Sequence, residues 1–200
     1  MALEKLAEDV FWIEGSDYCS NIYILMDKAT AIVIDTGDGT TDIEREIGRK
    51  PDLCVFTHGH MDHTKGAKEG WDCCLRKEDF RKEFPYFVPD FVKPLESDRI
   101  TLGSFDLEII RTPGHTKGGI CLLEKKRNVL FTGDTLFSEG WIGRTDMPGG
   151  NDRDMIASLE LLLSRFAKDK DAKIIIPFDF DSCELNVSCL CSGHGTPKRF

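Results

Sequence analysis

The chain has 200 residues, of which 40% are hydrophobic and 30% charged, and a formal net charge of −9 at pH 7. A chain of this length can bury a sizeable core without disulfides, so we expect one domain over residues 1–200. The acidic balance argues against nucleic acid and membrane surfaces as partners, because both require clustered Lys and Arg.

The first residues are acidic, with Glu4, Glu8 and Asp9 where a secretory signal would need basic and apolar residues. No apolar run approaches the length of a membrane span. We therefore predict a cytoplasmic protein. Its eight cysteines are then expected to be reduced thiols rather than a disulfide framework.

The first half of the chain reads mainly as short strands. Apolar runs predict strands over 10–13, 21–26, 31–35 and 53–56. Thr41 or Asp42 can cap a helix that Gly48 ends after Ile47.

The second half repeats this organisation. A polar helix is predicted over 77–83, followed by strands over 100–102, 105–111, 120–123 and 129–132. Apolar residues at helical spacing predict a helix over 152–166, and a strand over 174–176 follows. The alternation of strands and helices favours an α+β fold in which helices cover two packed sheets. The aromatic stretch 84–91 fits either loop packing against the core or a substrate-facing flap.

All five histidines stand beside Gly, Asp or Thr in turn-like contexts directly after apolar strand patterns. His58 and His60 are two residues apart, which an extended segment projects to the same side, and Asp62 and His63 follow at once. One loop can therefore supply ligands to two metal ions.

Three further candidate ligands occur singly: His115, Asp134 and His194. Small residues flank each of them, and glycine lets the backbone approach a crowded site. Neutral imidazole with carboxylate is the ligand set of zinc, iron or manganese.

Residues 57–63, which read Thr-His-Gly-His-Met-Asp-His, resemble the T-H-x-H-x-D-H motif of the metallo-β-lactamase-fold superfamily. The single-ligand loops match in order along nearly the whole chain. Residues 132–137 (Thr-Gly-Asp-Thr-Leu-Phe) and 143–146 (Gly-Arg-Thr-Asp) are similar to the glyoxalase II (hydroxyacylglutathione hydrolase) branch, especially its short single-domain members.

The resemblance implies an αβ/βα four-layer sandwich, in which two mixed β-sheets are flanked by helices. It also implies two divalent metal ions, Zn²⁺ first and Fe or Mn as alternatives. Asp62 and Asp134 would be catalytic ligands, with Asp134 and a hydroxide bridging the ions. The implied ligands of the two metals are His58, His60 and His115 for one, and Asp62, His63 and His194 for the other.

The function implied is a binuclear metal-dependent hydrolase that cleaves small S-hydroxyacyl thioesters by a metal-bridging hydroxide. With every histidine assigned as a ligand, none is left as general acid, and a thiolate leaving group needs one least. Arg144 matches a basic residue that binds glutathione in glyoxalase II, but Asp146 stands where that family usually has an aromatic residue. Glutathione specificity is therefore open, and nothing in the sequence specifies an oligomeric state.

Three alternatives stay open. A mononuclear iron persulfide dioxygenase shares the fold and keeps counterparts of His58, His115 and Asp134. The others are another hydrolase of this fold, acting on esters or lactones, and a non-catalytic metal-binding domain.

One stretch departs from the relatives, which run directly from a strand ending in proline into Gly-His-Gly. Here residues 178–192 separate Pro177 from Gly193, and we interpret them as an insert with a strand over 185–190. The Cys189-Leu190-Cys191 pattern is weak evidence for a redox or metal role.

Overall fold

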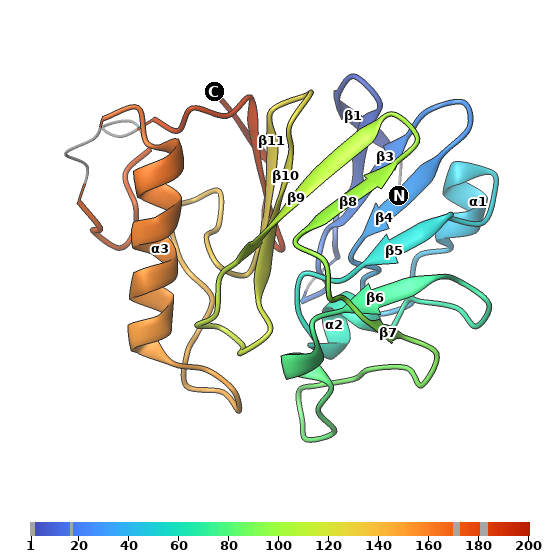
Figure 1. Cartoon of the computed structure of the whole chain (residues 1–200), viewed down its shortest axis with the longest axis horizontal. Coiled ribbons are helices and arrows are strands. Elements are labelled where there is room, and N and C mark those ends of the chain that lie inside the picture. The colour runs from blue at the N-terminus through green and yellow to red at the C-terminus, as the bar shows by residue number, and fades with distance from the viewer. Residues whose placement is uncertain (1–2, 17, 170–172, 181–183) are drawn as a thin grey trace.

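The computed structural model describes residues 3–16, 18–169, 173–180 and 184–200, and consists of two packed β-sheets (Figure 1). The seven-stranded sheet has its strands in chain order: β1 (Glu4–Ala7), β2 (Val10–Ile13), β3 (Ile22–Met26), β4 (Ala31–Ile34), β5 (Leu53–Val55), β6 (Cys73–Leu75) and β7 (Lys93–Pro94). The six-stranded sheet has the order β13 (Lys198–Arg199), β12 (Cys189–Ser192), β11 (Val129–Gly133), β10 (Ile120–Glu124), β9 (Phe105–Arg111) and β8 (Arg99–Leu102).

Both sheets are mixed. In the first sheet, β1 to β4 pair antiparallel, whereas β4 to β7 pair parallel. In the second, β8 to β11 form an antiparallel meander, and β12 joins β11 in parallel. The parallel pairs matter for function, because neighbouring parallel strands end at the same edge of a sheet.

Apolar side chains from both sheets meet in one core. Tyr23, Ile34 and Val55 of the first sheet pack in the same buried cluster as Phe131 and Leu107 of the second. The Tyr23 and Phe131 rings meet edge to face with centroids 5.2 Å apart, which favours this sheet-to-sheet contact beyond the area it buries.

The other face of each sheet is covered by a helix. Ile43 and Ile47 of α1 (Ile43–Ile47) pack on the outer face of the seven-stranded sheet. The buried stripe of α3 (Asp152–Phe166) packs on the outer face of the six-stranded sheet. Helix, sheet, sheet and helix lie in that order across the molecule (Figure 1), which confirms the predicted α+β, αβ/βα architecture.

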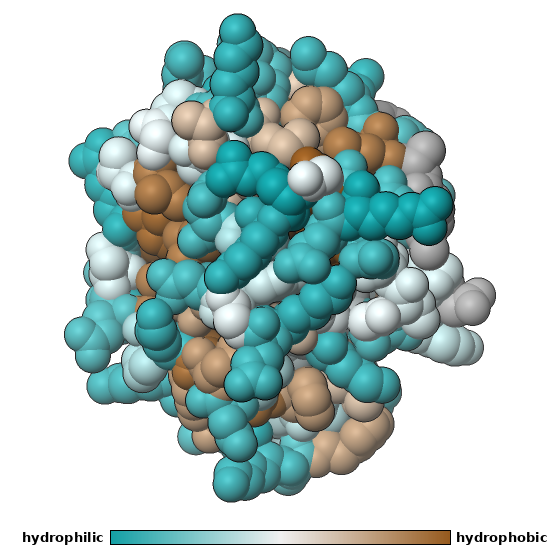
Figure 2. All heavy atoms as spheres, turned by 90° about the vertical axis from the view of Figure 1, so that its right-hand side faces the viewer, coloured by the Kyte–Doolittle hydropathy of each residue, from teal (hydrophilic) through white to brown (hydrophobic). Residues whose placement is uncertain are grey.

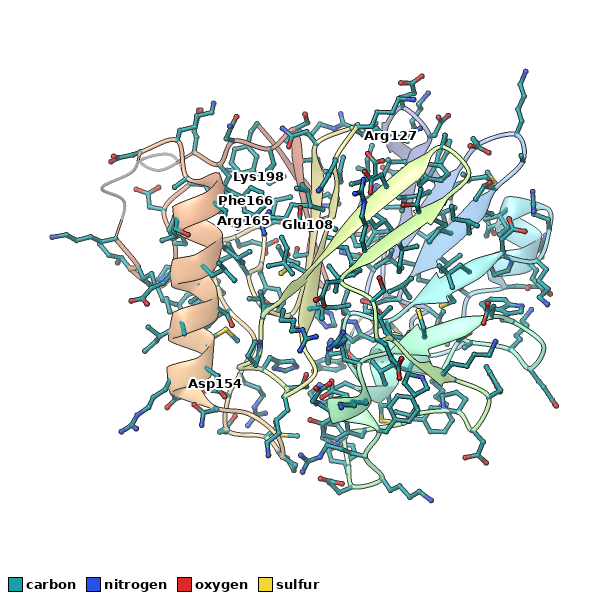
Figure 3. All side chains as sticks on the ribbon, in the orientation of Figure 1. Glu108, Arg127, Asp154, Arg165, Phe166 and Lys198 are labelled. Carbon is teal, nitrogen blue, oxygen red and sulfur yellow. The ribbon has the colours of Figure 1, made fainter. Side chains whose placement is uncertain are left out.

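Helix α3 spans the predicted residues because its sequence carries both end signals. The Asn151 side chain accepts a hydrogen bond from the Asp154 N–H and so caps the first turn. In the last turn, Arg165 forms a 2.8 Å ion pair with Glu108 on β9 (Figure 3). The Arg165 ion pair joins the helix to its sheet.

Polar side chains connect the two sheets at the edge opposite the ends of β4 and β5. Arg127, after β10, pairs with Asp9 between β1 and β2 at 2.6 Å (Figure 3). Asp27, after β3, accepts hydrogen bonds from the Ser104 hydroxyl at 2.6 Å and from the Thr30 N–H. The Ser104 bond, followed by local backbone N–H bonds, lowers the pKa of Asp27 to about 2.

Two predicted elements are wrong. Residues 174–176 form no strand, because β12 occupies the position beside β11, and Ile175 is left 69% exposed. The predicted helix over 77–83 is only a 3-10 turn, η1 (Lys77–Asp79). Strand β12 also begins later than the predicted strand over 185–190, and β1, β6, β7 and β13 were not predicted.

The face beyond the seven-stranded sheet is mostly hydrophilic with smaller apolar patches (Figure 2). Among the described residues, no helix combines the length and the apolar character needed to cross a membrane.

Candidate metal centre

Strand direction brings the predicted ligands to one edge of the sandwich. Parallel strands β4 and β5 end there, so Asp35, directly after β4, accepts a hydrogen bond from the N–H of Thr57, the residue before His58. In the second sheet β9, β11 and β12 run in one direction, since β10 is antiparallel to both β9 and β11. The loops after these three strands carry His115, Asp134 and His194.

Asp62 and His63 lie in a one-turn helix, α2 (Met61–Thr64), at the lower side of the sandwich in Figure 1. The sequence predicted a turn here, with no histidine inside a helix, and that detail is wrong. His60 precedes the helix in an extended conformation. The change from strand to helix turns His63 back toward β4, where its Nδ1 lies 2.8 Å from Asp35.

The seven predicted ligands gather into three overlapping groups. Within each group, one ligand atom from every residue lies within 4.8 Å of the others. The groups are His58, His60 and His115; Asp62, His63 and His194; and His58, His63 and Asp134. The first two coincide with the predicted triads, and the third connects them. Metal binding by these residues stays a prediction.

The donor atoms fit a cation. Nε2 of His58, Nε2 of His63 and Oδ1 of Asp134 are buried, have no hydrogen-bond partner among the described residues, and belong to residues of one of these groups. A buried polar atom left without a partner costs about 1–3 kcal/mol, so three such atoms at one place favour a common partner. Lone pairs of imidazole and carboxylate are what a divalent transition metal binds.

Asp134 lies between the two triads. Its Oδ2 is 3.5 Å from Nε2 of His115 and 3.6 Å from Nε2 of His194, and its Oδ1 is 3.4 Å from Nε2 of His63. One carboxylate thus contacts ligands of both groups, as a bridging ligand would.

Two of the candidate histidine ligands have lowered pKa values, and another has a raised one. Burial holds the pKa of His58 well below its usual range and lowers the pKa of His60 to about 3, with the nearby imidazoles adding to this. Burial also lowers the pKa of His194, but hydrogen bonds to Asp134 and Asp62 outweigh it and raise the pKa to about 9. His58 and His60 are therefore neutral at pH 7, the form in which imidazole binds a metal, whereas His194 would have to release a proton to bind one.

The comparison with known families agrees with this geometry. Residues 17–177 match the model of the metallo-β-lactamase superfamily. The chain belongs to this superfamily. The match ends at Pro177, directly before the segment that we interpreted as an insert.

Named relatives support the assignment. A probable metallo-hydrolase of Methanocaldococcus jannaschii is 33% identical over 191 residues, which cover 82% of this chain and 89% of that protein. The hydroxyacylglutathione hydrolase GloC of Haemophilus influenzae is 32% identical, over 68% of this chain and 75% of its own length. The solved metallo-β-lactamase of Pontibacter korlensis is 19% identical with a TM-score of 0.72, and the alignment covers 98% of this chain and 92% of that one.

Asp35, directly after β4, contacts both a candidate ligand and the loop that carries His58. Its Oδ2 lies 2.8 Å from Nδ1 of His63 and 2.7 Å from the Thr57 hydroxyl. Its Oδ1 accepts the Thr57 N–H at 2.8 Å. The Asp35 carboxylate therefore connects β4 to the residue before His58 and directs Nε2 of His63 toward the centre.

Asp79 is a site residue that sequence reasoning missed. This fully buried carboxylate accepts the Gly59 N–H at 2.9 Å, the Gly118 N–H at 2.7 Å and the Thr116 hydroxyl at 2.7 Å. It thereby connects the loop of His58 and His60 with the loop of His115. Burial raises the pKa of Asp79, and the three hydrogen bonds oppose that rise.

Two glycines allow the ligand loops to approach closely. A side chain at Gly193 would collide with the Asp134 carboxylate, and one at Gly59 would come within 2.8 Å of the Asp79 carbonyl oxygen. Gly193 therefore allows His194, which follows β12, to lie beside Asp134 although an insert precedes the strand. Residues 181–183 of that insert lie outside the described part of the chain. The Sγ atoms of Cys189 and Cys191 lie 3.7 Å apart in this strand, but they belong to the buried core.

The metal centre opens into a cleft of about 640 Å³. Arg144, predicted to bind substrate, lines this cleft, but its guanidinium pairs with Asp146 at 2.6 Å. Of the stretch 84–91, Phe84 lines the cleft and is 73% exposed, whereas Tyr86 is buried behind His60. The stretch therefore contributes both to the cleft and to the core.

Proposed function

We propose that the protein is a binuclear metal-dependent thioester hydrolase, with Zn²⁺ as the first choice of metal. The observation that carries this proposal is the presence of two complete ligand triads with Asp134 between them. The complete second triad also favours two ions over the single iron of a persulfide dioxygenase.

The residues that would hold the metals are the two triads, with Asp134 between them. Two bound divalent ions would lower the pKa of a water molecule between them and polarise the substrate carbonyl. Asp62 is 29% exposed at the cleft, so its carboxylate can orient the attacking water. Asp35 and Asp79 hold the ligand loops in place.

The proposed reaction adds water to the carbonyl carbon of the thioester and breaks the carbon–sulfur bond. The oxygen of water ends in the carboxylate product; of its two protons, one ends on the sulfur of the released thiol and the other passes to solvent. All five histidines lie in the centre, so no other imidazole can protonate the leaving group. A thiol with a pKa of about 8.5 leaves as thiolate without such help.

The substrate that we propose is a small S-hydroxyacyl thioester in the cytoplasm. Support comes from similarity to the hydroxyacylglutathione hydrolase of Haemophilus influenzae, at 32% identity. The acidic chain, with a net charge of −9, supports a small molecule over nucleic acid as partner.

A thiol-release assay on protein loaded with Zn²⁺, Fe²⁺ or Mn²⁺ tests this function. We expect the loaded protein to hydrolyse an S-hydroxyacyl thioester. Its kcat/KM should fall by at least about 100-fold in Asp134→Ala and should not fall in the surface variant Asp72→Asn. Absence of thiol release with every metal would refute the proposal. One iron per chain with persulfide-dependent oxygen uptake would instead favour the dioxygenase.

A further inference from the structure

The cleft above the metal centre is mainly apolar once the candidate ligands are set aside. Six of its lining residues are apolar and come from four separate segments of the chain: Tyr18, Met61, Phe84, Pro85, Phe137 and Met147. These segments are the loop between β2 and β3, the start of α2, the loop after η1 and the loop before α3. The apolar lining is thus a shared property of the cleft rather than of one loop.

Two of these rings are unusually exposed. Tyr18 is 91% exposed and Phe84 is 73% exposed, although the protein has a large buried core available to it. Exposed aromatic rings at a cleft favour contact with an apolar group of a ligand, because such contact removes them from water. Phe137 extends the apolar surface to the metal centre, since its ring centroid is 5.9 Å from that of His194.

Positive charge in the cleft is neutralised. Arg144 is the one Lys or Arg among the described residues that line it. Both Nε and a terminal nitrogen of its guanidinium bond to the Asp146 carboxylate, at 2.6 and 2.7 Å. Glutathione carries two carboxylates, and their recognition requires free cationic donors. The described cleft offers none.

From these observations we propose that the cleft selects thioesters with an uncharged, apolar thiol portion, which packs on Tyr18 and Phe84, over glutathione thioesters. This proposal rests on the proposed thioester hydrolysis and specifies its substrate class. Asp146 acts as a specificity-determining residue, because its pairing with Arg144 removes the cation that an anionic thiol carrier would use.

The test uses one hydroxyacyl group joined to a series of neutral alkanethiols of increasing chain length. Two further substrates carry glutathione and a neutral thiol of matched pKa. We expect kcat/KM of the metal-loaded protein to rise by up to about fourfold for each methylene buried. The neutral thioester should also be preferred over its glutathione counterpart.

Substitutions in the cleft test which residues cause the dependence on chain length and the preference against glutathione. Tyr18→Ser and Phe84→Ser should each flatten the dependence on chain length, whereas Leu161→Gln, which changes an exposed apolar residue on α3 outside the cleft, should retain it. Asp146→Ala releases Arg144 and should raise kcat/KM for the glutathione thioester by about twofold to fivefold, the range of an exposed ion pair. It should leave the ratio among the neutral thioesters unchanged.

Calorimetry with the corresponding non-hydrolysable thioethers gives a readout that does not depend on turnover. Tighter binding of longer neutral thioethers would support binding of an apolar thiol portion in the cleft. If no thioester were hydrolysed in that case, only the proposed reaction would be refuted. Hydrolysis with a preference for glutathione and no effect of chain length would overturn this inference and leave the proposed function intact.

Discussion

The buried carboxylate of Asp79 provides the sharpest test of how the metal centre is held. It contacts no proposed metal, yet it accepts hydrogen bonds from both ligand loops. Asp79→Ala leaves the N–H groups of Gly59 and Gly118 buried without an acceptor. At about 1–3 kcal/mol for each unsatisfied donor, the loss is about 2–6 kcal/mol. Asp79→Asn keeps one oxygen and turns an amide nitrogen toward one N–H, so it should lose about 1–3 kcal/mol.

Urea unfolding of the metal-free proteins measures these losses without the contribution of bound metal. The control is Asp72→Asn, since Asp72 is 54% exposed and pairs with Lys93 on the surface, a pair worth about 0–1 kcal/mol. We expect the order Asp79→Ala, Asp79→Asn, Asp72→Asn in decreasing loss of stability, and the same order in loss of metal affinity. An Asp79→Ala protein as stable as the control would refute the role assigned to this residue.

Three further predictions concern the centre and the opposite edge of the sandwich. Gly193→Ala places a methyl group against the Asp134 carboxylate and should lower the metal content from two ions to at most one by elemental analysis. Asp35→Asn should lower the affinity for the second metal by about 10-fold to 100-fold in a competition titration, because His63 loses its charged partner. The hydrogen bond from Ser104 is the main reason why the pKa of Asp27 is lowered to about 2. The charged carboxylate therefore stabilises the fold above about pH 4, and this stabilisation disappears as the pH falls through about 2. The difference in Tm between wild type and Asp27→Asn should therefore narrow as the pH is lowered over this range.

Each of these predictions has a result that contradicts it. Two tightly bound ions in Gly193→Ala would mean that β12 can move away from Asp134. Unchanged affinity in Asp35→Asn would mean that packing alone orients His63. A Tm difference in Asp27→Asn that widens with acid would reverse the sign expected for a carboxyl group with a lowered pKa.

The ligand cluster could be predicted from sequence because its signals are local. His58, His60, Asp62 and His63 lie within six residues of one another, and strand patterns precede all the single ligands. Because parallel strands end at the same edge of a sheet, strand direction alone then brings the distant ligand loops together. The helix over 152–166 was predictable for the same reason, since its cap and its apolar stripe lie within the segment itself.

Other features depend on tertiary contacts that no local pattern contains. Asp79 reads as part of a polar stretch, and only the fold places it beneath Gly59 and Gly118. The run 174–176 is apolar enough for a strand, but β12 occupies the position beside β11. The pairing of Arg144 with Asp146 is likewise a property of one loop conformation, and it changes the interpretation of the cleft.

We propose that this chain binds two metal ions through two triads bridged by Asp134. Titration of metal-free protein with Zn²⁺, followed by calorimetry and elemental analysis, tests it most directly. We predict two ions per chain in the wild type and one in His194→Ala. A single ion in the wild type, or two ions in His194→Ala, would contradict the assignment of the second triad.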